Sequence, residues 1–221
     1  MKFTKTLLTT ALFSFSVLSA SPMAYAVSDP KTQFQQGLEA AERGDFATAL
    51  QLWKPLAEQG NASSQFNLAL MYHKGKGVKP DYFQAVKWYQ KAAEQGDAKA
   101  QYKLGDMYYW DWGEGVKKDH VQAFKWYQKA AEQGHAKAQF NLGNMYYDGE
   151  GVKKDYVQAF KWYQKAAKKG DAEAQYRLGC MYYLGQGVKQ DSNLAKMWVG
   201  KACENGEKYG CDVYRMLNEG K

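Results

Sequence analysis

The sequence has little proline and, beyond its first residues, no long apolar run. Only 4 of its 221 residues are proline, and with 21 glycines this composition excludes a collagen-like or low-complexity chain. A mean hydropathy of −0.66 excludes a membrane protein with several spans. The chain does contain 45% hydrophobic and 15% aromatic residues, which is too much for a disordered tail. We therefore expect a folded, soluble protein.

The first 26 residues resemble a secretory signal rather than part of a fold. Lys2 and Lys5 give a positive start, residues 7–18 are largely apolar, and Ala24-Tyr25-Ala26 offers small residues for cleavage after Ala26. The apolar stretch is shorter than the ~20 residues that cross a membrane. No cysteine follows the cleavage point to carry a lipid anchor. We expect a periplasmic or secreted protein that is not an integral membrane protein.

The charge of the remaining chain is only mildly positive. Without the first 26 residues it has 28 basic and 23 acidic side chains, and the two signs are interspersed. This distribution is typical of a solvated surface rather than of a nucleic-acid footprint. We expect no nucleic-acid partner.

The dominant feature of the sequence is a repeat of 36 residues. Full copies cover 62–97, 98–135, 136–171 and 172–207. A loose terminus over 27–33 and a shortened copy over 34–61 precede them, and a terminal capping helix over 208–221 follows. The copy over 98–135 is 38 residues long because two extra residues lie in the segment Trp110-Asp111-Trp112.

Each full copy contains two amphipathic helical patterns. In the copy over 98–135 the recurring positions are Ala100, Leu104 and Met107 on the first helix, and Ala123 and Tyr127 on the second. Their spacing places each set on one face of its helix, which predicts packing. One helix pair cannot bury such a face alone, so neighbouring copies must stack and share a core.

Glycines and aspartates mark the ends of these helices. A G-x-G turn lies between the two helices of each full copy, at Gly75 and Gly77, Gly113 and Gly115, Gly149 and Gly151, and Gly185 and Gly187. An aspartate then caps the second helix, at Asp45, Asp81, Asp119, Asp155 and Asp191. Glutamine three residues later predicts a capping box in three copies, through Gln84, Gln122 and Gln158.

The repeated residues resemble the Sel-1-like repeat, a relative of the tetratricopeptide repeat, over about 34–221. The matching pattern is Ala100-Gln101-x-x-Leu104-Gly105-x-Met107-Tyr108, Gly113-x-Gly115-Val116, Asp119, Ala123, Trp126-Tyr127-x-Lys129-Ala130-Ala131 and Gly134. The resemblance implies an all-α, right-handed superhelical solenoid of antiparallel helix pairs. It also implies that the chain holds protein or peptide partners, and in some exported bacterial members cell-wall or host components. Nothing in the pattern requires a cofactor.

The resemblance extends in part to the exported, cysteine-rich branch of the family. Cys203 and Cys211 are eight positions apart, similar to the paired cysteines that form disulfides in that branch, although this chain has the pair only once. The resemblance therefore implies a Cys203–Cys211 disulfide in an oxidising compartment, which would stabilise the fold by about 2.5 kcal/mol. Two packed thiols are the alternative. Cys180 is left over, and we assign it no role.

The positions of the first helices that vary between copies are the candidate binding surface. If the first helices line the concave side, as the resemblance suggests, these positions form a mixed polar groove, whose members are Asn67, Lys103, Asn141 and Arg177, with Leu70, Asp106, Asn144 and Cys180 one turn later. Neutral variation on a wet surface is the alternative. Tyr109, Trp110 and Trp112 at the insertion either mark a contact or fold over the neighbouring pair.

Signals for catalysis are weak. His73, in a predicted turn, His120 and His135 lie in different copies where other copies have tyrosine or aspartate, so we interpret them as surface substitutions without a metal. Ser28-Asp29-Pro30-Lys31 matches the S-x-x-K motif of β-lactam enzymes without its companion motifs. We therefore expect a monomeric, non-catalytic exported scaffold. A β-lactamase-like or penicillin-binding hydrolase is the alternative, because some cysteine-rich relatives are described in this way, and a purely structural spacer is a third hypothesis.

Overall fold

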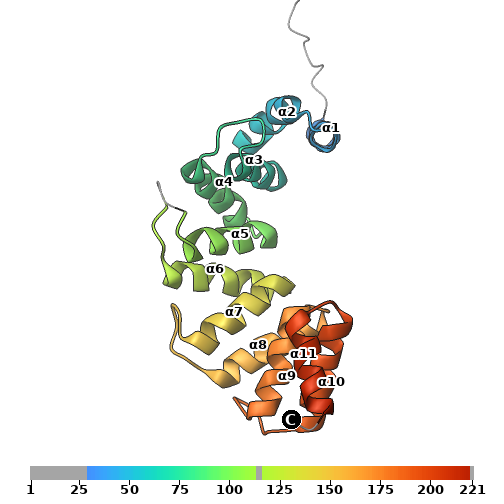
Figure 1. Cartoon of the computed structure of the whole chain (residues 1–221). Coiled ribbons are helices and arrows are strands. Elements are labelled where there is room, and N and C mark those ends of the chain that lie inside the picture. Colours follow the sequence, from blue (N-terminus) through green and yellow to red (C-terminus); the bar gives the residue numbers. More distant parts are fainter. Residues whose placement is uncertain (1–28, 113–115, 220–221) are drawn as a thin grey trace, which may run out of the picture.

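The protein is a row of α-helices (Figure 1). The computed structural model describes residues 29–112 and 116–219, and within these ranges it contains eleven helices and no strand. The helices are α1 (Pro30–Glu42), α2 (Phe46–Glu58), α3 (Ala62–Lys74), α4 (Tyr82–Glu94), α5 (Ala98–Tyr109), α6 (His120–Glu132), α7 (Ala136–Asp148), α8 (Tyr156–Lys168), α9 (Ala172–Leu184), α10 (Ser192–Glu204) and α11 (Lys208–Asn218). Residues expected to form a signal peptide, and Gly113 and Gly115, lie outside the described ranges.

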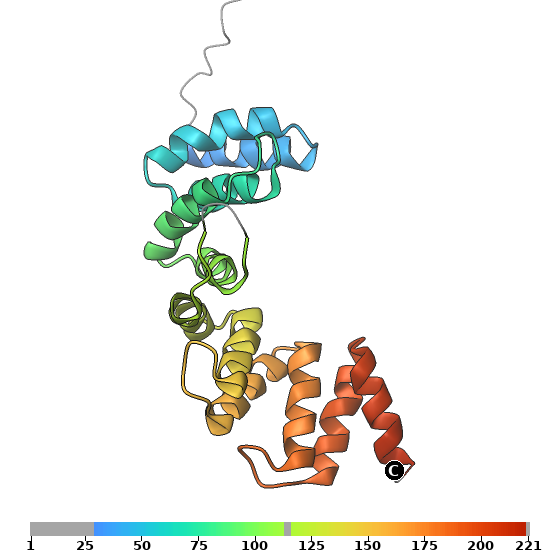
Figure 2. The same cartoon turned by 60° about the vertical axis from the view of Figure 1, so that its left-hand side comes forward.

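Successive helix pairs stack into a solenoid. Each helix packs against the one before it and the one after it, from α1 on α2 to α10 on α11. The pairs follow a curved path from the blue α1–α2 end to the red α10–α11 end (Figures 1 and 2). The predicted all-α solenoid of helix pairs is therefore confirmed.

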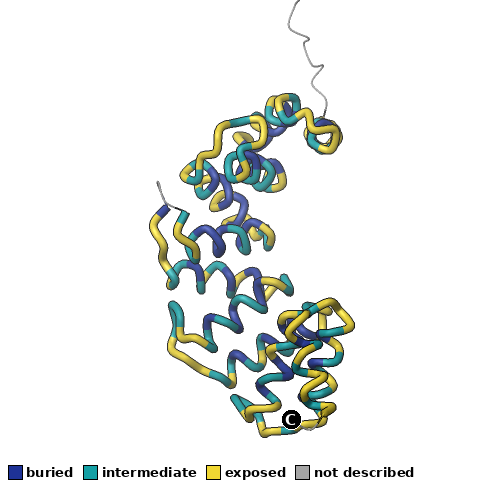
Figure 3. Tube along the Cα trace, viewed as in Figure 1, coloured by how far each residue is buried: buried dark blue, intermediate teal, exposed yellow. Residues whose placement is uncertain are grey.

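The core lies between the helices and is built from the recurring positions. Buried residues, dark blue in Figure 3, follow the sides of the helices that face their neighbours, whereas the loops are largely exposed. Leu104 and Met107 of α5 are completely buried, and Tyr127 of α6 is only 1% exposed. A Cβ atom on Gly105 would lie 2.5 Å from that ring. Glycine is thus what allows α5 and α6 to approach closely.

The second helices begin at the predicted aspartates, but the capping boxes are incomplete. Asp81 accepts a hydrogen bond from the backbone N–H of Gln84 at 2.9 Å. The N–H of Asp81 itself donates to the carbonyl of Tyr72 at 3.0 Å, and the same bond recurs from Asp119 and Asp155 to the preceding first helix. The N–H groups of these aspartates therefore already donate to carbonyl groups of the preceding first helix. The predicted hydrogen bonds from these N–H groups to the side chains of Gln84, Gln122 and Gln158 are wrong for this reason.

The glycine turns join each repeat to the one before it. Gly149 ends α7 in the left-handed conformation, with φ of 80°. Gly151, with φ of 68°, lies so close to the start of α6 that a Cβ atom would be 2.2 Å from the carbonyl oxygen of His120. Gly187 has the same relation to Tyr156. Glycine is required here both for backbone angle and for space.

Buried glutamines form a second connection between repeats, which the sequence pattern did not predict. The Nε2 group of each glutamine donates a hydrogen bond of 3.0 to 3.1 Å to a carbonyl of the preceding second helix. The four glutamines are Gln65, Gln101, Gln139 and Gln175. The Oε1 atoms of Gln65, Gln101 and Gln175 accept from a side chain after the next second helix. Among the described residues, Oε1 of Gln139 has no hydrogen-bond partner, because Lys169 stands where the other repeats have an amide.

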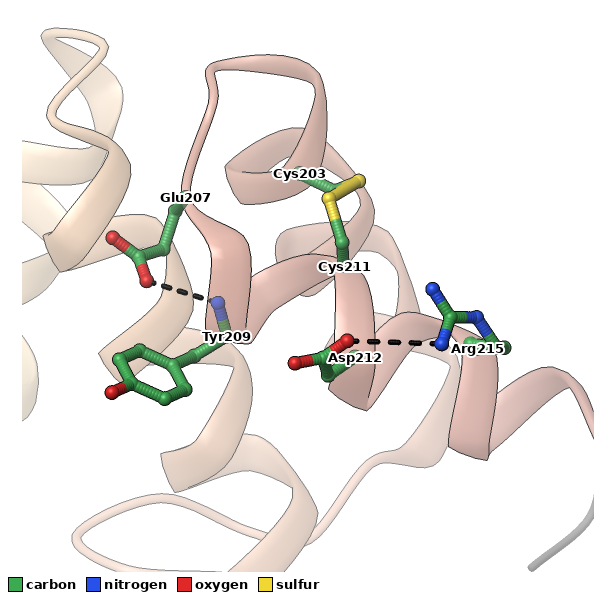
Figure 4. Close-up of a disulfide and its surroundings, with 6 residues drawn as sticks. All are labelled: Cys203, Glu207, Tyr209, Cys211, Asp212 and Arg215. Carbon is green, nitrogen blue, oxygen red and sulfur yellow. Dashed lines mark hydrogen bonds and ion pairs between the residues drawn. A yellow bond between two sulfur atoms is a disulfide. The ribbon is translucent and has the colours of Figure 1, made fainter.

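A disulfide joins the last two helices (Figure 4). Cys203 near the end of α10 and Cys211 in α11 are bonded, with their Cα atoms 4.5 Å apart. Helix α11 packs mainly on one neighbour, α10, and the bond fixes it there. The implied Cys203–Cys211 disulfide is confirmed.

The first helix begins earlier than the repeat pattern indicated. Asp29 accepts from the N–H groups of Lys31 and Thr32, and Pro30 occupies the first turn. Residues 30–33 are therefore helical rather than a loose terminus, because a capping aspartate and a proline at N1 favour helix initiation.

Candidate binding groove

Two adjoining hollows follow the first helices of successive repeats. One, of about 660 Å³, is lined by α3, α5, α7 and the insertion. The other, of about 350 Å³, extends from α5 and α7 to the start of α9 and the turn before α11. Tyr102 and Asn141 line both. We call the two hollows together the first-helix groove.

Five of the nine predicted contact residues line this groove, namely Lys103, Asp106, Trp110, Trp112 and Asn141. Asn67 lines a smaller neighbouring hollow that shares Leu70 and Lys74 with the groove. Tyr109, Asn144 and Arg177 line none of these hollows.

Asp106 is an internal group rather than an open contact residue. It is only 8% exposed. Its carboxylate accepts from the Tyr127 hydroxyl at 2.8 Å and from Lys103 Nζ at 3.0 Å. Burial raises the pKa of Tyr127, and the neighbouring carboxylate raises it further, so the phenol remains a neutral donor. The expectation that position 106 faces water or a partner is wrong, because a hydroxyl from α6 reaches it.

The same position in the other repeats also faces the second helix, which has tyrosine there in three repeats and valine in the fifth. In the fourth repeat, 136–171, Tyr163 donates to Asn144 at 2.7 Å. In the second, 62–97, Leu70 offers no acceptor, and the Tyr89 hydroxyl lies 3.4 Å from Nδ1 of His73 instead. In the fifth, 172–207, Val199 replaces tyrosine opposite a half-buried Cys180. Part of the variation that suggested a ligand surface therefore reflects internal pairing.

The aromatic residues at the insertion divide into two packed rings and one exposed ring. Tyr109 donates its hydroxyl to Glu150 of the next repeat and stacks on His120, with ring centroids 4.9 Å apart. Trp112 packs against His73 at 4.9 Å and donates Nε1 to the Asp106 carbonyl at 3.3 Å. Trp110 is 57% exposed. The chain leaves α5 at Trp110 in an extended conformation, because no glycine is available there to continue the turn.

The histidines are packed, not surface substitutions as we had inferred. His73 lies within α3, not in a turn, and its ring meets Tyr82 and Tyr89 as well as Trp112. Burial lowers the pKa of His73, and the Lys103 charge lowers it further. His135 is the N-cap of α7, where Nδ1 accepts from the N–H of Ala138 at 3.3 Å.

Within the described ranges, no three His, Cys, Asp or Glu side chains lie close enough to share a metal ion. Of the Ser28-Asp29-Pro30-Lys31 motif, Ser28 lies outside those ranges, and Asp29 and Pro30 serve to begin α1. None of the described helices has both the length and the apolar character needed to cross a bilayer.

Comparison with protein families identifies the repeat. The Sel1 repeat matches residues 34–61, 62–97, 98–135, 136–171 and 172–207. The chain belongs to the Sel1 repeat family. Proteins with curated descriptions gave no match.

Solved structures include Sel1 repeat proteins with the same fold. A protective antigen present in uropathogenic Escherichia coli strains, described as displaying an SLR fold, is 37% identical with a TM-score of 0.78. The alignment covers 82% of this chain but only 39% of that one, so this Sel1 chain spans about two fifths of the antigen's length. A Sel1 repeat protein from Oxalobacter formigenes is also 37% identical, with a TM-score of 0.73 over 84% of this chain and 75% of that one.

A third similar structure is cysteine rich protein B of Helicobacter pylori. It is 28% identical, with a TM-score of 0.48, over 63% of this chain and 98% of that one.

Proposed function

We propose that this Sel1 repeat protein is an exported, monomeric and non-catalytic scaffold that holds a protein or peptide along the first-helix groove. Its ligand belongs to the cell envelope or to a host, and it is not a nucleic acid. The observation that carries the proposal is that one hollow is lined by variable positions of two successive first helices, Lys103 and Asn141, together with the exposed Trp110 of the insertion.

The chemistry of the groove supports a peptide-like ligand. The exposed Trp110 ring provides a large apolar contact area, of the kind that is enriched at binding hot spots. The Asn141 amide, shared by both hollows, can donate to and accept from a backbone. Lys103 already pairs with Asp106, so its position is set before a ligand arrives. An aromatic anchor beside ordered polar groups suits an extended polypeptide.

Capture of partners from the source cell tests this proposal. Immobilised mature protein is compared with the variants Trp110→Ala and Tyr209→Ala after crosslinking in the native envelope. Both side chains are exposed, at 57% and 67%, but Tyr209 lies on α11 outside the groove. We expect Trp110→Ala to lose a stoichiometric partner that Tyr209→Ala retains. Equal capture by all three proteins, or no partner with any of them, contradicts the groove and favours a structural spacer.

Two further measurements separate the remaining alternatives. Sustained turnover of a chromogenic β-lactam by the purified protein would establish the hydrolase, whereas the scaffold predicts none. Fractionation of the source cell is expected to place the protein, cleaved after Ala26, in the periplasm or the medium.

A further inference from the structure

A further hollow, of about 740 Å³, lies on the side of the second helices and shares no lining residue with the first-helix groove. It is formed by one side of α4, by Tyr108 of α5 and by the segment that leads into α6. Val86, Tyr108 and Val116 supply apolar surface, and the Phe83 side chain stands at its edge, 62% exposed. We call this hollow the second-helix pocket.

In this repeat the phenylalanine stands three residues earlier than in the next two, at the exposed Phe83 where they have Val121 and Val157. Phe124 and Phe160 occupy the position of Val86 in the next two repeats. Their rings pack edge-on against Tyr146 and Tyr182, the counterparts of Tyr108, with centroids 5.3 and 5.2 Å apart. Val86 has no ring to place against Tyr108. The space beside Tyr108 is therefore complementary to the side chain of phenylalanine.

The rim of the pocket is positively charged. It carries four exposed lysines, Lys87, Lys91, Lys117 and Lys118. Within the described part of the chain, none of them forms an ion pair. The rim also carries two acidic residues, Glu94, which accepts from Gln90, and Asp119, which caps α6, so its net charge is +2. Nζ of Lys91 also lies 4.4 Å from the centroid of the Trp88 ring. A net positive rim around an apolar floor favours a ligand with carboxylates beside an apolar group.

We propose that the second-helix pocket binds an acidic peptide segment that inserts a phenylalanine ring against Tyr108, with flanking carboxylates directed to the lysine rim. The pocket volume falls in the range that holds a side chain with its neighbours. The apolar floor is short, which fits one ring better than an acyl chain. This site is separate from the first-helix groove, so the scaffold holds two ligands on different sides.

Fluorescence anisotropy of the full-length mature protein tests the proposal. The probe is a labelled peptide with a central phenylalanine and two glutamates on each side. We expect saturable binding below about 1 mM that weakens with added salt, and a loss of about tenfold or more when alanine replaces the phenylalanine of the probe. No saturable binding, or equal binding of the alanine probe, overturns the proposal.

The repeat itself supplies a variant that fills the pocket. Val86→Phe restores the residue found at positions 124 and 160, so we expect the fold to be retained and probe binding to fall about tenfold or more. Lys117→Glu with Lys118→Glu weakens binding without entering the core. The matched control is Lys153→Glu with Lys154→Glu in the next repeat, where Phe124 fills the equivalent space, and it should bind normally.

Three results on these variants contradict the site. One is undiminished binding by Val86→Phe. A second is an equal loss with both lysine pairs, which would indicate unspecific charge attraction. The third is binding to phosphatidylglycerol vesicles that Val86→Phe abolishes while the peptide does not bind, which would assign the pocket to a lipid.

Discussion

The third and fourth repeats, 98–135 and 136–171, share most of their sequence. They differ at the end of the first helix and at the residue that accepts the second-helix hydroxyl. The fourth ends its first helix at a left-handed Gly149, whereas the third leaves its helix at an extended Trp110 and exposes that ring. The second-helix hydroxyl meets a carboxylate in the third repeat, at Asp106, and an amide in the fourth, at Asn144. The fourth repeat thus represents the regular packing unit, and the third a modified one.

This comparison teaches that variation between repeats has more than one cause. Asp106 and Asn144 are two different acceptors for the same tyrosine hydroxyl of the second helix, so this difference lies inside the repeat and does not indicate a ligand. Trp110 differs because the insertion displaces the glycine that ends the helix elsewhere. Only the second kind of change leaves an exposed side chain, so it is the better indicator of a binding surface.

The largest loss of stability is expected from breaking the contact between the turn that follows α7 and the start of α6. Gly151→Ala combines a positive φ with a Cβ atom only 2.2 Å from the His120 carbonyl oxygen. We expect the free energy of unfolding to fall by about 3 kcal/mol. The control Gly170→Ala also has a positive φ but no atom within 4 Å, and should cost about 1 kcal/mol. Urea denaturation measures the free energy of unfolding of both variants. Equal losses would show that the turn containing Gly151 does not pack against the start of α6.

Removing the two tyrosine hydroxyls compares the repeats directly. Tyr127→Phe leaves the buried Asp106 carboxylate without its donor from α6, which should cost about 2 kcal/mol. Tyr163→Phe leaves an amide oxygen, and should cost about 1 kcal/mol. Thermal denaturation at neutral pH checks the order. A larger loss for Tyr163→Phe would refute the charged pairing at Asp106.

Restoring the missing hydrogen bond to Gln139 should give the fourth repeat the same glutamine contact that the third repeat has at Gln101. Lys169→Gln supplies a donor for the unpartnered Oε1 of Gln139, and should stabilise the protein by about 1 kcal/mol. Gln133→Lys removes the donor that Gln101 has in the third repeat, and should destabilise it by a similar amount. Chemical denaturation of both variants tests the pair, and the account fails here if Lys169→Gln is neutral.

The smallest expected effect concerns pH. Burial lowers the pKa of His135, which caps α7 through Nδ1, whereas Asp97 caps α5 in the third repeat. The unfolded chain therefore takes up a proton more readily, and stability falls as the pH decreases below 6.5. The loss should not exceed about 1 kcal/mol, the value of one cap. His135→Asp should reduce this decline between pH 7 and 5, as measured by urea denaturation, and an unchanged decline would exclude His135 as its source.

Much of the fold could be predicted because its signals are local and repeated. Three of these signals depend on spacing within one helix, and each recurs in several repeats. They are the aspartate caps, the terminal glycines and the buried stripe that contains Leu104 and Met107. The structure confirms these features and the terminal disulfide.

The candidate sites were less predictable because they depend on contacts between elements. Spacing along α5 places Asp106 on a variable stripe, and only the position of α6 shows that Tyr127 covers it. The second-helix pocket has a sequence signal, valine at 86 where two other repeats have phenylalanine, but its meaning requires knowing that those rings lie on tyrosines. The N-cap role of His135 could have been found by comparison with Asp97 and Asp171.

Photocrosslinking in the source cell tests the central claim, a ligand held along the first-helix groove, most directly. A photoreactive phenylalanine analogue replaces either Asn141, which lines both hollows of the groove, or Lys161, an exposed residue of α8 that lines neither. The account predicts a discrete crosslinked partner from position 141 and none from position 161. No adduct at 141, or the same adduct at both positions, would contradict it.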